Sequence, residues 1–213
     1  MLQILLKSMK NFNNFIEGSD KMQILKMLTR LRQLCLEPRL VYDNIDQPSS
    51  KLKACMELIK TMQENKQKVL LFSSFTSALG LIAEECQKAG ITYYMLTGST
   101  NKEERRELVS RFQKDDTTLF LISLKAGGTG LNLTSAENVI HYDPWWNVSA
   151  QNQATDRAYR IGQKSNVQVF NLVMKDSVEE KIIEMQKRKK ELADMFVENN
   201  SGGLSQMSKE DIL

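Results

Sequence analysis

The chain has 213 residues, of which 41% are hydrophobic and 26% are charged, the balance of an ordinary globular protein. Its 29 basic and 26 acidic residues leave a net charge of +3, which is too small to argue for nucleic-acid binding by itself. No apolar run approaches the ~20 residues that a membrane span needs. Three separated cysteines and a single histidine argue against a disulfide framework and against a metal site.

The N-terminal region is expected to be helical and accessory. Apolar residues recur at helical spacing from Lys21 to Leu36, and Pro38 ends the pattern. The stretch Asp43–Ser50 has the composition of a linker. A second amphipathic helix is expected from Lys51 to Glu64.

From Lys68 onward the pattern changes to an alternation of strands and helices. Short, wholly apolar runs are typical of strands that are covered on both faces. The expected strands are Val69–Phe72, Thr92–Leu96, Thr118–Ile122, Val139–Tyr142 and Val167–Val173. With helices between them, they predict an α/β fold whose parallel sheet is flanked by helices on both faces. Ligands of such sheets meet the loops at the carboxyl ends of the strands.

Two capping boxes mark expected helix starts. Thr100 and Glu103 would begin a helix after the second strand, and Ser177 and Glu180 would begin a long terminal helix that runs to Val197. The second of these predicts a helical C-terminal extension outside the sheet.

A stretch after the fourth strand, QATDRAYRIGQ, places two arginines three residues apart. On a helix, Gln153, Arg157 and Arg160 share one face. Apolar residues recur at the same spacing and form a stripe on the adjacent face of that helix. The apolar stripe would fix the helix to a core while both guanidiniums face an anion. Each guanidinium offers a planar fork that suits phosphate oxygens. For an isolated pair, a solvated arginine face is the alternative.

The segment SLKAGGTGLNLT, from Ser123 to Thr134, directly follows an expected buried strand. Three glycines in four residues let the backbone turn sharply and bring N–H groups to a ligand, which suits phosphate. Leu133 stands where a dinucleotide fingerprint requires a third glycine, so a nucleotide-binding oxidoreductase is disfavoured. A glycine-rich turn without a ligand is the remaining alternative.

Two adjacent tryptophans, Trp145 and Trp146, follow the next strand within the sequence DPWWN. Neighbouring residues of an extended segment point to opposite sides, so at least one ring is expected to reach solvent or a partner. An aromatic ring in this loop, at the carboxyl ends of the strands, would suit a nucleic-acid groove.

Together these segments resemble the second RecA-like lobe of Swi/Snf-type helicases of superfamily two, which are ATP-driven translocases on double-stranded DNA. SLKAGGTGLNLT with DPWWN resembles the family's motif V and its extension, and QATDRAYRIGQ is similar to motif VI almost letter for letter. Other resembling segments, which extend the match over most of the chain, are Leu31–Cys35, Lys68–Thr76 (motif IV), Leu96–Thr100 and Ser177–Glu184.

The resemblance implies roles for individual residues. Arg157 and Arg160 would be arginine fingers on a γ-phosphate, and a finger of this kind is worth ~10³–10⁵ in rate. The nucleotide-binding residues would be Gly128, Gly130, Gln153 and Asp156. Contacts to DNA phosphates, which position a protein without reading sequence, would come from Ser73, Thr97, Gly98, Ser99, Ser123, Lys125 and Gly127, with Trp146 at the groove.

Half of an ATP site is missing from this sequence. It contains no GxxxxGKS or GxxxxGKT loop and no Asp-Glu pair after a buried strand, so nothing in it would cradle the β- and γ-phosphates or hold Mg²⁺. We therefore expect the chain to be the C-terminal lobe of a larger protein that uses ATP and Mg²⁺. We expect the lobe alone to lack ATPase activity.

The expected organisation is a helical accessory region at 1–48, a RecA-like lobe at 49–176 and a helical extension at 177–213. Expected partners are the N-terminal RecA-like lobe of the same protein, the backbone of double-stranded DNA, and a nucleoprotein or polymerase, with no membrane. A lobe without long insertions leans bacterial, which implies a cytoplasmic, nucleoid-associated protein; a eukaryotic source would imply the nucleus. The alternative function is a non-catalytic module that binds DNA or protein through the strand-end rim.

Overall fold

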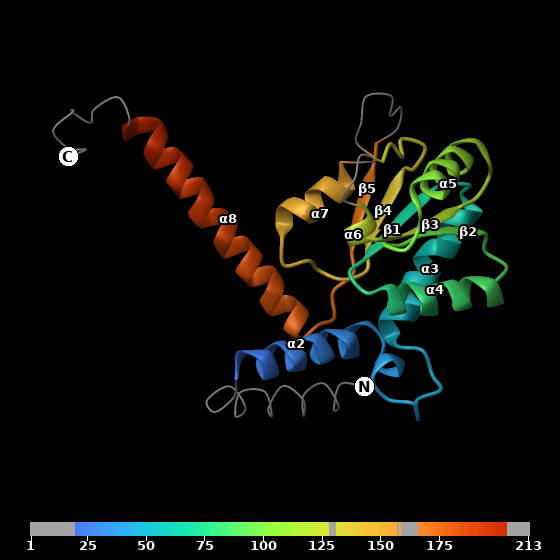
Figure 1. Ribbon diagram of the computed structural model, residues 1–213, viewed down its shortest axis with the longest axis horizontal. Helices are drawn as coiled ribbons and strands as arrows, with labels where there is room; N and C mark the ends of the chain where they lie inside the picture. Colours follow the sequence, from blue (N-terminus) through green and yellow to red (C-terminus); the bar gives the residue numbers. More distant parts are fainter. Residues whose placement is uncertain (1–19, 128–130, 157, 159–165, 204–213) are drawn as a thin grey trace.

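The computed structural model describes residues 20–127, 131–156, 158 and 166–203. Five parallel strands form one sheet in the order β2-β3-β1-β4-β5 (Figure 1). They are β1 (Val69–Ser73), β2 (Tyr93–Leu96), β3 (Leu119–Ser123), β4 (Asn138–His141) and β5 (Gln168–Asn171). The parallel α/β sheet expected from the sequence is confirmed, and each strand end lies within two residues of its expected position.

The central strand β1 is buried along its whole length, as is its neighbour β3. Leu71 of β1 pairs with Leu121 of β3 on one side and with Ile140 of β4 on the other. Strands covered on both faces read as unbroken apolar runs, which is why these segments are recognisable in the sequence. The edge strand β5 is largely exposed.

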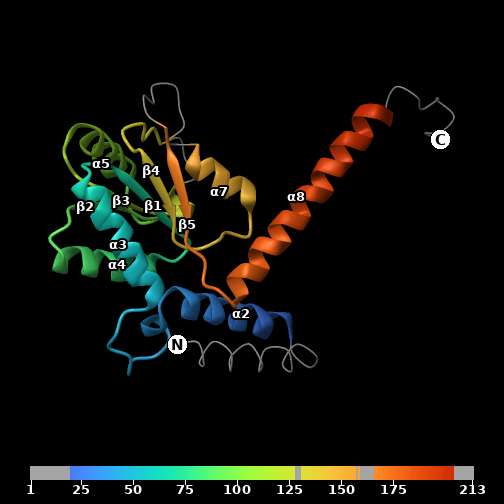
Figure 2. The ribbon, with the colours of Figure 1, turned by 180° about the vertical axis from the view of Figure 1, so that it is seen from behind.

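Helices cover both faces of the sheet (Figures 1 and 2). Successive residues of a strand point to opposite faces, so Leu71 enters one apolar core and Leu70 the other. The first core is covered by α3 (Ser50–Glu64) and α4 (Thr76–Lys88). The second is covered by α5 (Lys102–Lys114) and α7 (Val148–Thr155).

The N- and C-terminal helices pack together beside the sheet. The helix α2 (Lys21–Leu36), followed by the short turn η1 (Pro38–Leu40), contacts the start of α8 (Val178–Gly203) through a small apolar cluster. From there α8 extends away from the sheet, as both ribbon views show (Figures 1 and 2). None of the described helices combines the length and the apolar character needed to cross a bilayer.

A buried ion pair fixes the start of α8 to α3 and thus to the sheet and its helices. The ammonium group of Lys51, at the start of α3, lies 2.7 Å from both carboxylate oxygens of Glu179. The side chains are 3% and 1% exposed, and the backbone N–H of Met174 donates a further hydrogen bond to the same carboxylate. Such hydrogen bonds are required for burying two charges, because both lose their hydration.

The helix caps differ from those expected. Asn101, not Thr100, caps α5, and its side chain accepts hydrogen bonds from the N–H groups of Glu103 and Glu104 at 3.0 and 2.9 Å. The Thr100 hydroxyl instead accepts a hydrogen bond from the N–H of Thr97. Asparagine is at least as good an N-cap as threonine, so the competing residue one step later prevails.

The start of α8 only partly follows the expected capping box. The hydroxyl of Ser177 accepts a hydrogen bond from the N–H of Glu179 at 3.1 Å, as a cap should. The Glu180 carboxylate reaches one residue further back than predicted, to the N–H of Asp176 at 2.9 Å. The helix also continues to Gly203, past the expected end at Val197.

Candidate functional site

The carboxyl ends of the strands bring the motif segments to one edge of the sheet. Because the strands are parallel, the loops after β1, β2, β3 and β4 all emerge at this edge. These loops include the segments that resemble motifs IV and V and the DPWWN extension. The sequence separates them by up to about 70 residues, yet the topology makes them neighbours.

Asp143, which follows β4, organises the centre of this edge. It is 2% exposed, and its carboxylate accepts hydrogen bonds from the hydroxyl of Ser73 at 2.7 Å and the N–H of Ser74 at 3.0 Å. The Ser74 hydroxyl also donates to it. The carboxylate therefore holds the turn after β1 in one conformation.

Arg32 of α2 supplies the positive charge that this buried carboxylate needs. One terminal nitrogen of its guanidinium donates to Asp143 at 3.0 Å and to the Ser74 hydroxyl at 2.8 Å. It also approaches the carbonyl of Pro144 at 3.4 Å, while the guanidinium lies over the ring of Phe75 at 4.9 Å from its centroid. The accessory helix α2 is thereby part of the site's framework.

The loop after β2 presents small polar groups to solvent. Gly98 and Ser99 are exposed, and the hydroxyls of Thr97 and Ser99 lie 2.8 Å apart. A Cβ built on Gly98 would meet no atom of the described residues within 4 Å, so nothing in that part of the molecule requires a glycine there. A ligand whose backbone approaches closely would require one.

The loop after β3 begins with a short helix that was not predicted from the sequence, α6 (Leu124–Gly127). Its first turn is held by the buried Ser123, whose hydroxyl accepts a hydrogen bond from the N–H of Ala126 at 3.3 Å. Arg105 of α5 donates to the carbonyl of Ala126 at 2.8 Å. Lys125, which lies in α6 between Ser123 and Ala126 in the sequence, is exposed.

The two tryptophans point in different directions, as expected. Trp145 is partly buried against the second core, and the side-chain amide of Gln186 on α8 donates to its carbonyl. Trp146 is 40% exposed. One ring thus fixes the loop, and the other is available at its rim.

The described part of the arginine segment confirms two of the three positions of the expected apolar stripe, Ala154 and Ala158, but not the length of the helix; the third, at 161, lies outside the described residues. Ala154 and Ala158 are 3% and 0% exposed, while Gln153 and Asp156 face solvent. The helix α7 ends at Thr155, so the prediction that one helix carries the whole segment is wrong. Arg157 and Arg160, together with the glycines 128 and 130, lie outside the described residues.

His141, the last residue of β4, connects this segment to the sheet. Its Nε2 lies 2.9 Å from the hydroxyl of Thr155, and its ring stacks on Phe72 with centroids 5.7 Å apart. Burial lowers the pKa of His141 to about 4, with Asp143 opposing the shift. The ring is therefore neutral at physiological pH and acts as a fixed support for the C-terminal end of α7.

The family of the chain follows from comparison with known proteins. Residues 50–162 match the model of the helicase conserved C-terminal domain. The chain belongs to the helicase C-terminal domain family of SWI2/SNF2 ATPases. The resemblance drawn from the sequence motifs is thus confirmed.

Individual relatives cover nearly the whole chain. An ATP-dependent helicase of Mycoplasma pneumoniae, itself described as uncharacterized, is 35% identical over 199 residues, which are 93% of this chain and 19% of that protein. The SWI2/SNF2 ATPase core domain of Sulfolobus solfataricus is 31% identical with a TM-score of 0.75, covering 99% of this chain and 45% of that one. The same core in complex with double-stranded DNA is 30% identical with a TM-score of 0.73, and the match covers 98% of this chain and 46% of that one. The chain therefore spans about a fifth of the length of the curated relative.

Within this helicase lobe, the predicted site residues fall into distinct groups. Five of the predicted DNA contacts, Thr97, Gly98, Ser99, Lys125 and Trp146, are exposed or partly exposed in loops at the strand-end edge. Ser73 and Ser123 lie at the same edge but are 0% and 4% exposed, and their hydroxyls take part in internal hydrogen bonds. Gly127 ends α6.

Sequence reasoning missed the two residues that hold the site together, Arg32 and Asp143. Asp143 carried a signal, because an aspartate directly after a buried apolar strand needs a partner. Arg32 lies in the segment Leu31–Cys35 that resembles the family, but nothing in the sequence distinguishes it from the other basic residues of the helix as the partner of Asp143.

No group of three or more metal-binding side chains occurs among the described residues. Mg²⁺ prefers carboxylate and water oxygens, and the carboxylate at the centre of this edge, Asp143, is already saturated by Arg32 and two serines. The described part of the lobe does not fit a resident Mg²⁺.

Proposed function

We propose that this chain is the second motor lobe of a DNA-dependent ATPase that moves along double-stranded DNA. The observation that carries the proposal is the gathering of exposed hydroxyls, an exposed glycine, Lys125 and Trp146 at the same sheet edge from which the arginine segment departs. The ATP site would lie between this edge and an N-terminal lobe that supplies the phosphate-binding loop.

On the nucleotide side, Arg157 and Arg160 would stabilise the negative charge that develops on the γ-phosphate during transfer. The buried Ala154 and Ala158 support this, because they anchor the segment on both sides of Arg157 in the sequence. The exposed Gln153 and Asp156 would orient the arginines or contact the nucleotide, and the glycines 128 and 130 would approach its edge.

On the DNA side, Thr97, Ser99 and Lys125 would contact phosphates of one strand, with Gly98 allowing close approach of the backbone. Trp146 would lie at the groove. The solved relative bound to double-stranded DNA supports this class of ligand. We assign Ser73 and Ser123 to holding these loops, since both are buried.

The proposal also requires that Mg²⁺ and the β- and γ-phosphates be held elsewhere. The N-terminal lobe would bind them, and closure of the two lobes around ATP would bring in the arginines. This chain alone would then bind duplex DNA weakly and hydrolyse no ATP.

The test replaces Arg157 or Arg160 by alanine in the protein that carries both lobes. ATPase activity in the presence of duplex DNA should fall by ~10³-fold or more, while DNA affinity stays unchanged. Arg111→Ala removes a positive charge from the exposed face of α5 and should leave both quantities intact.

A non-catalytic binding module predicts a different result. In that case the arginine variants would hydrolyse ATP at the rate of the unaltered protein and bind DNA more weakly. ATP hydrolysis by the purified chain alone, stimulated by duplex DNA, would also contradict the division of the site between two lobes.

A further inference from the structure

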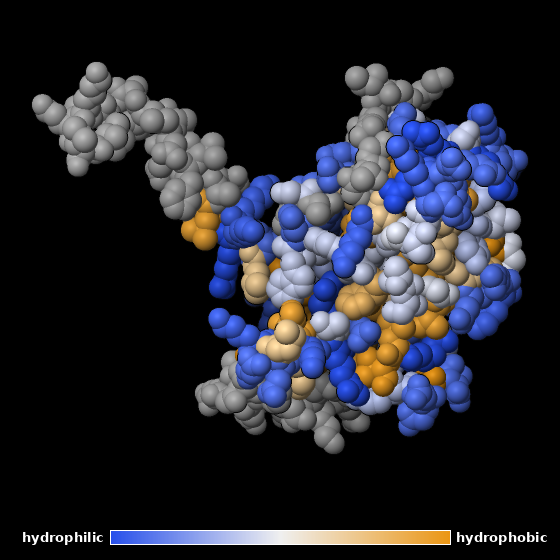
Figure 3. Space-filling model, in the orientation of Figure 1, coloured by the Kyte–Doolittle hydropathy of each residue, from blue (hydrophilic) through white to orange (hydrophobic). Residues whose placement is uncertain are grey.

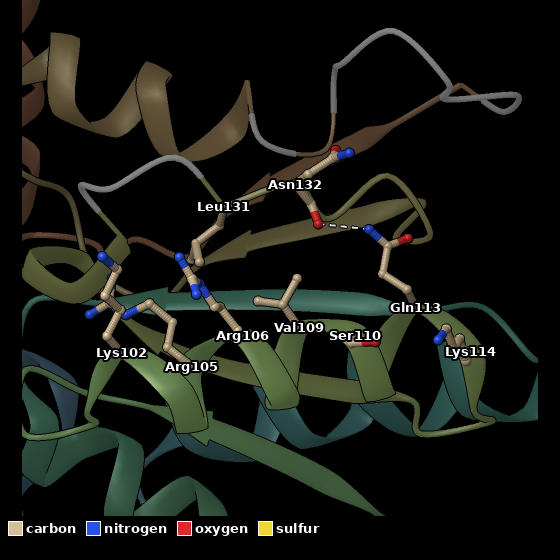
Figure 4. Close-up of a pocket in the computed structure, with 9 residues that line it drawn as sticks. All are labelled: Lys102, Arg105, Arg106, Val109, Ser110, Gln113, Lys114, Leu131 and Asn132. Carbon is tan, nitrogen blue, oxygen red and sulfur yellow. Dashed lines mark hydrogen bonds between the residues drawn. The ribbon is translucent and has the colours of Figure 1, made fainter.

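A groove along α5 is not accounted for by the ATP and DNA contacts. It has a volume of about 690 Å³, within the ~300–1,000 Å³ typical of ligand sites. Its wall is one face of α5, and its opposite side is the segment that follows the glycine loop (Figure 4). The lining residues are Lys102, Arg105, Arg106, Val109, Ser110, Gln113, Lys114, Leu131 and Asn132, and we call this the α5 groove.

The basic and acidic residues of α5 lie largely on different faces of the helix. Eight of its thirteen residues are charged, and hydrophilic side chains cover this part of the surface (Figure 3). Among the described residues, four cations line the groove and all come from this helix, whereas none of its three glutamates lines the groove. The fifth cation, Arg111, lies off the groove and pairs with Glu107 at 3.7 Å. The groove is therefore positive along its rim although the helix as a whole carries mixed charge.

The floor of the groove is apolar. Val109 and Leu131 face each other across it, and both also belong to the second core or pack against it. Two hydrogen bonds fix the walls, one from Gln113 to the carbonyl of Asn132 at 2.7 Å and one from Arg105 to the carbonyl of Ala126 at 2.8 Å. A groove held in this way is preformed, which lowers the cost of binding.

The dimensions suit a short extended peptide. Lys114 lies twelve positions after Lys102, so the groove is about 18 Å long at 1.5 Å per helical residue. An extended chain covers that length with about five or six residues. Cations at both ends and an apolar centre call for carboxylates that flank one bulky apolar side chain.

We propose that the α5 groove binds an acidic protein segment with a central aromatic or large aliphatic residue. This function goes beyond the motor activity and is separate from the ATP and DNA contacts. The DNA backbone is a poorer fit, because phosphates and sugars bring no large apolar group to cover Val109 and Leu131. The occupant is a segment of another protein, which a peptide added in trans represents.

The experiment uses the whole chain and a short fluorescent peptide made of glutamates and aspartates around one phenylalanine. Binding is followed by fluorescence anisotropy at fixed ionic strength. We expect saturable binding that weakens by ~10-fold or more in Arg106→Glu, because a charge reversal replaces attraction by repulsion. Arg111→Glu makes the same change in net charge on the same helix and should alter the affinity less than ~2-fold.

Two comparisons separate the groove from general electrostatics and from DNA binding. A peptide with serine in place of phenylalanine should bind at least ~5-fold more weakly, since it cannot cover the apolar floor. A duplex DNA probe should bind the Arg106→Glu and Arg111→Glu variants with equal affinity. Equal loss of peptide binding in both variants, equal affinity for the two peptides, or a selective loss of DNA binding in Arg106→Glu would each overturn the proposal. None of these results depends on ATP hydrolysis, so they test the groove proposal without testing the proposed motor function.

Discussion

Arg32 and Asp143 are 111 residues apart in the chain and form a hydrogen-bonded ion pair of 3.0 Å. The pair joins the accessory helix α2 to the loop after β4, and the same carboxylate holds the turn after β1. The side chains are 13% and 1% exposed. Three separate segments that resemble the family therefore share one electrostatic contact.

We expect Arg32→Ala to destabilise the lobe by about 3 kcal/mol, because it leaves Asp143 buried without its counter-charge. Arg32→Lys should cost less than Arg32→Ala, since it keeps the positive charge but loses the planar guanidinium, one nitrogen of which contacts three acceptors. Urea unfolding measures both. Arg30→Ala, an exposed neighbour on the same helix, should change stability by no more than about 0.5 kcal/mol. Equal losses for Arg30→Ala and Arg32→Ala would show that the ion pair is unimportant.

The buried pair of Lys51 and Glu179 gives a second prediction. Glu179→Gln should destabilise the lobe by about 3 kcal/mol, because it removes one charge of a buried pair and leaves the other. The double variant Lys51→Met with Glu179→Leu should recover most of that loss, since it removes both charges and keeps the volume apolar. Thermal unfolding of the unaltered chain, Glu179→Gln and the double variant tests this. A double variant that is less stable than Glu179→Gln would contradict it.

The neutral His141 predicts a specific dependence of stability on pH. Its pKa is about 4 in the folded state and about 6.5 when unfolded, so the unfolded chain binds more protons between these values. The stabilisation is complete above pH 6.5 and is lost as pH falls towards 4. From pH 7 to pH 5 the loss should be about 2 kcal/mol.

The measurement is direct because His141 is the only histidine of the chain. Its ring resonances, followed by NMR, should show no titration between pH 8 and pH 5. His141→Asn should be less stable at pH 7 but should lose less stability on acidification than the unaltered chain. A ring that titrates near pH 6.5 would contradict the assigned environment.

How much of this structure could be predicted depends on whether the determinants are local. The strands β1 and β3 are unbroken apolar runs, so their type and position follow from the sequence. Helix ends are decided by competition between adjacent residues, and here Asn101 replaced the expected Thr100. Long-range polar pairs leave no periodic trace, which is why Asp143 could be suspected of needing a partner while Arg32 could not be identified as that partner.

Gly98, in the loop after β2, gives the sharpest test of the proposed DNA contact. A Cβ at Gly98 would meet no atom within 4 Å in the part of the chain that the structure describes, so Gly98→Ala should leave the stability of the lobe unchanged or slightly raised. If a DNA backbone approaches this loop closely, the added methyl group should weaken duplex binding by about 1 kcal/mol, or ~5-fold. Fluorescence anisotropy with a labelled duplex at low salt measures the affinity.

Gly80 provides the matched control, because a Cβ there also has open space but the residue lies within α4, in the helical layer of the first core. Gly80→Ala should raise stability by up to about 1 kcal/mol through helix propensity and should not affect DNA binding. The loop after β2 would be excluded as a DNA contact if Gly98→Ala bound duplex DNA as tightly as Gly80→Ala. Because neither substitution creates a clash with the described residues, a loss of affinity in Gly98→Ala alone is attributed to a ligand that approaches the loop.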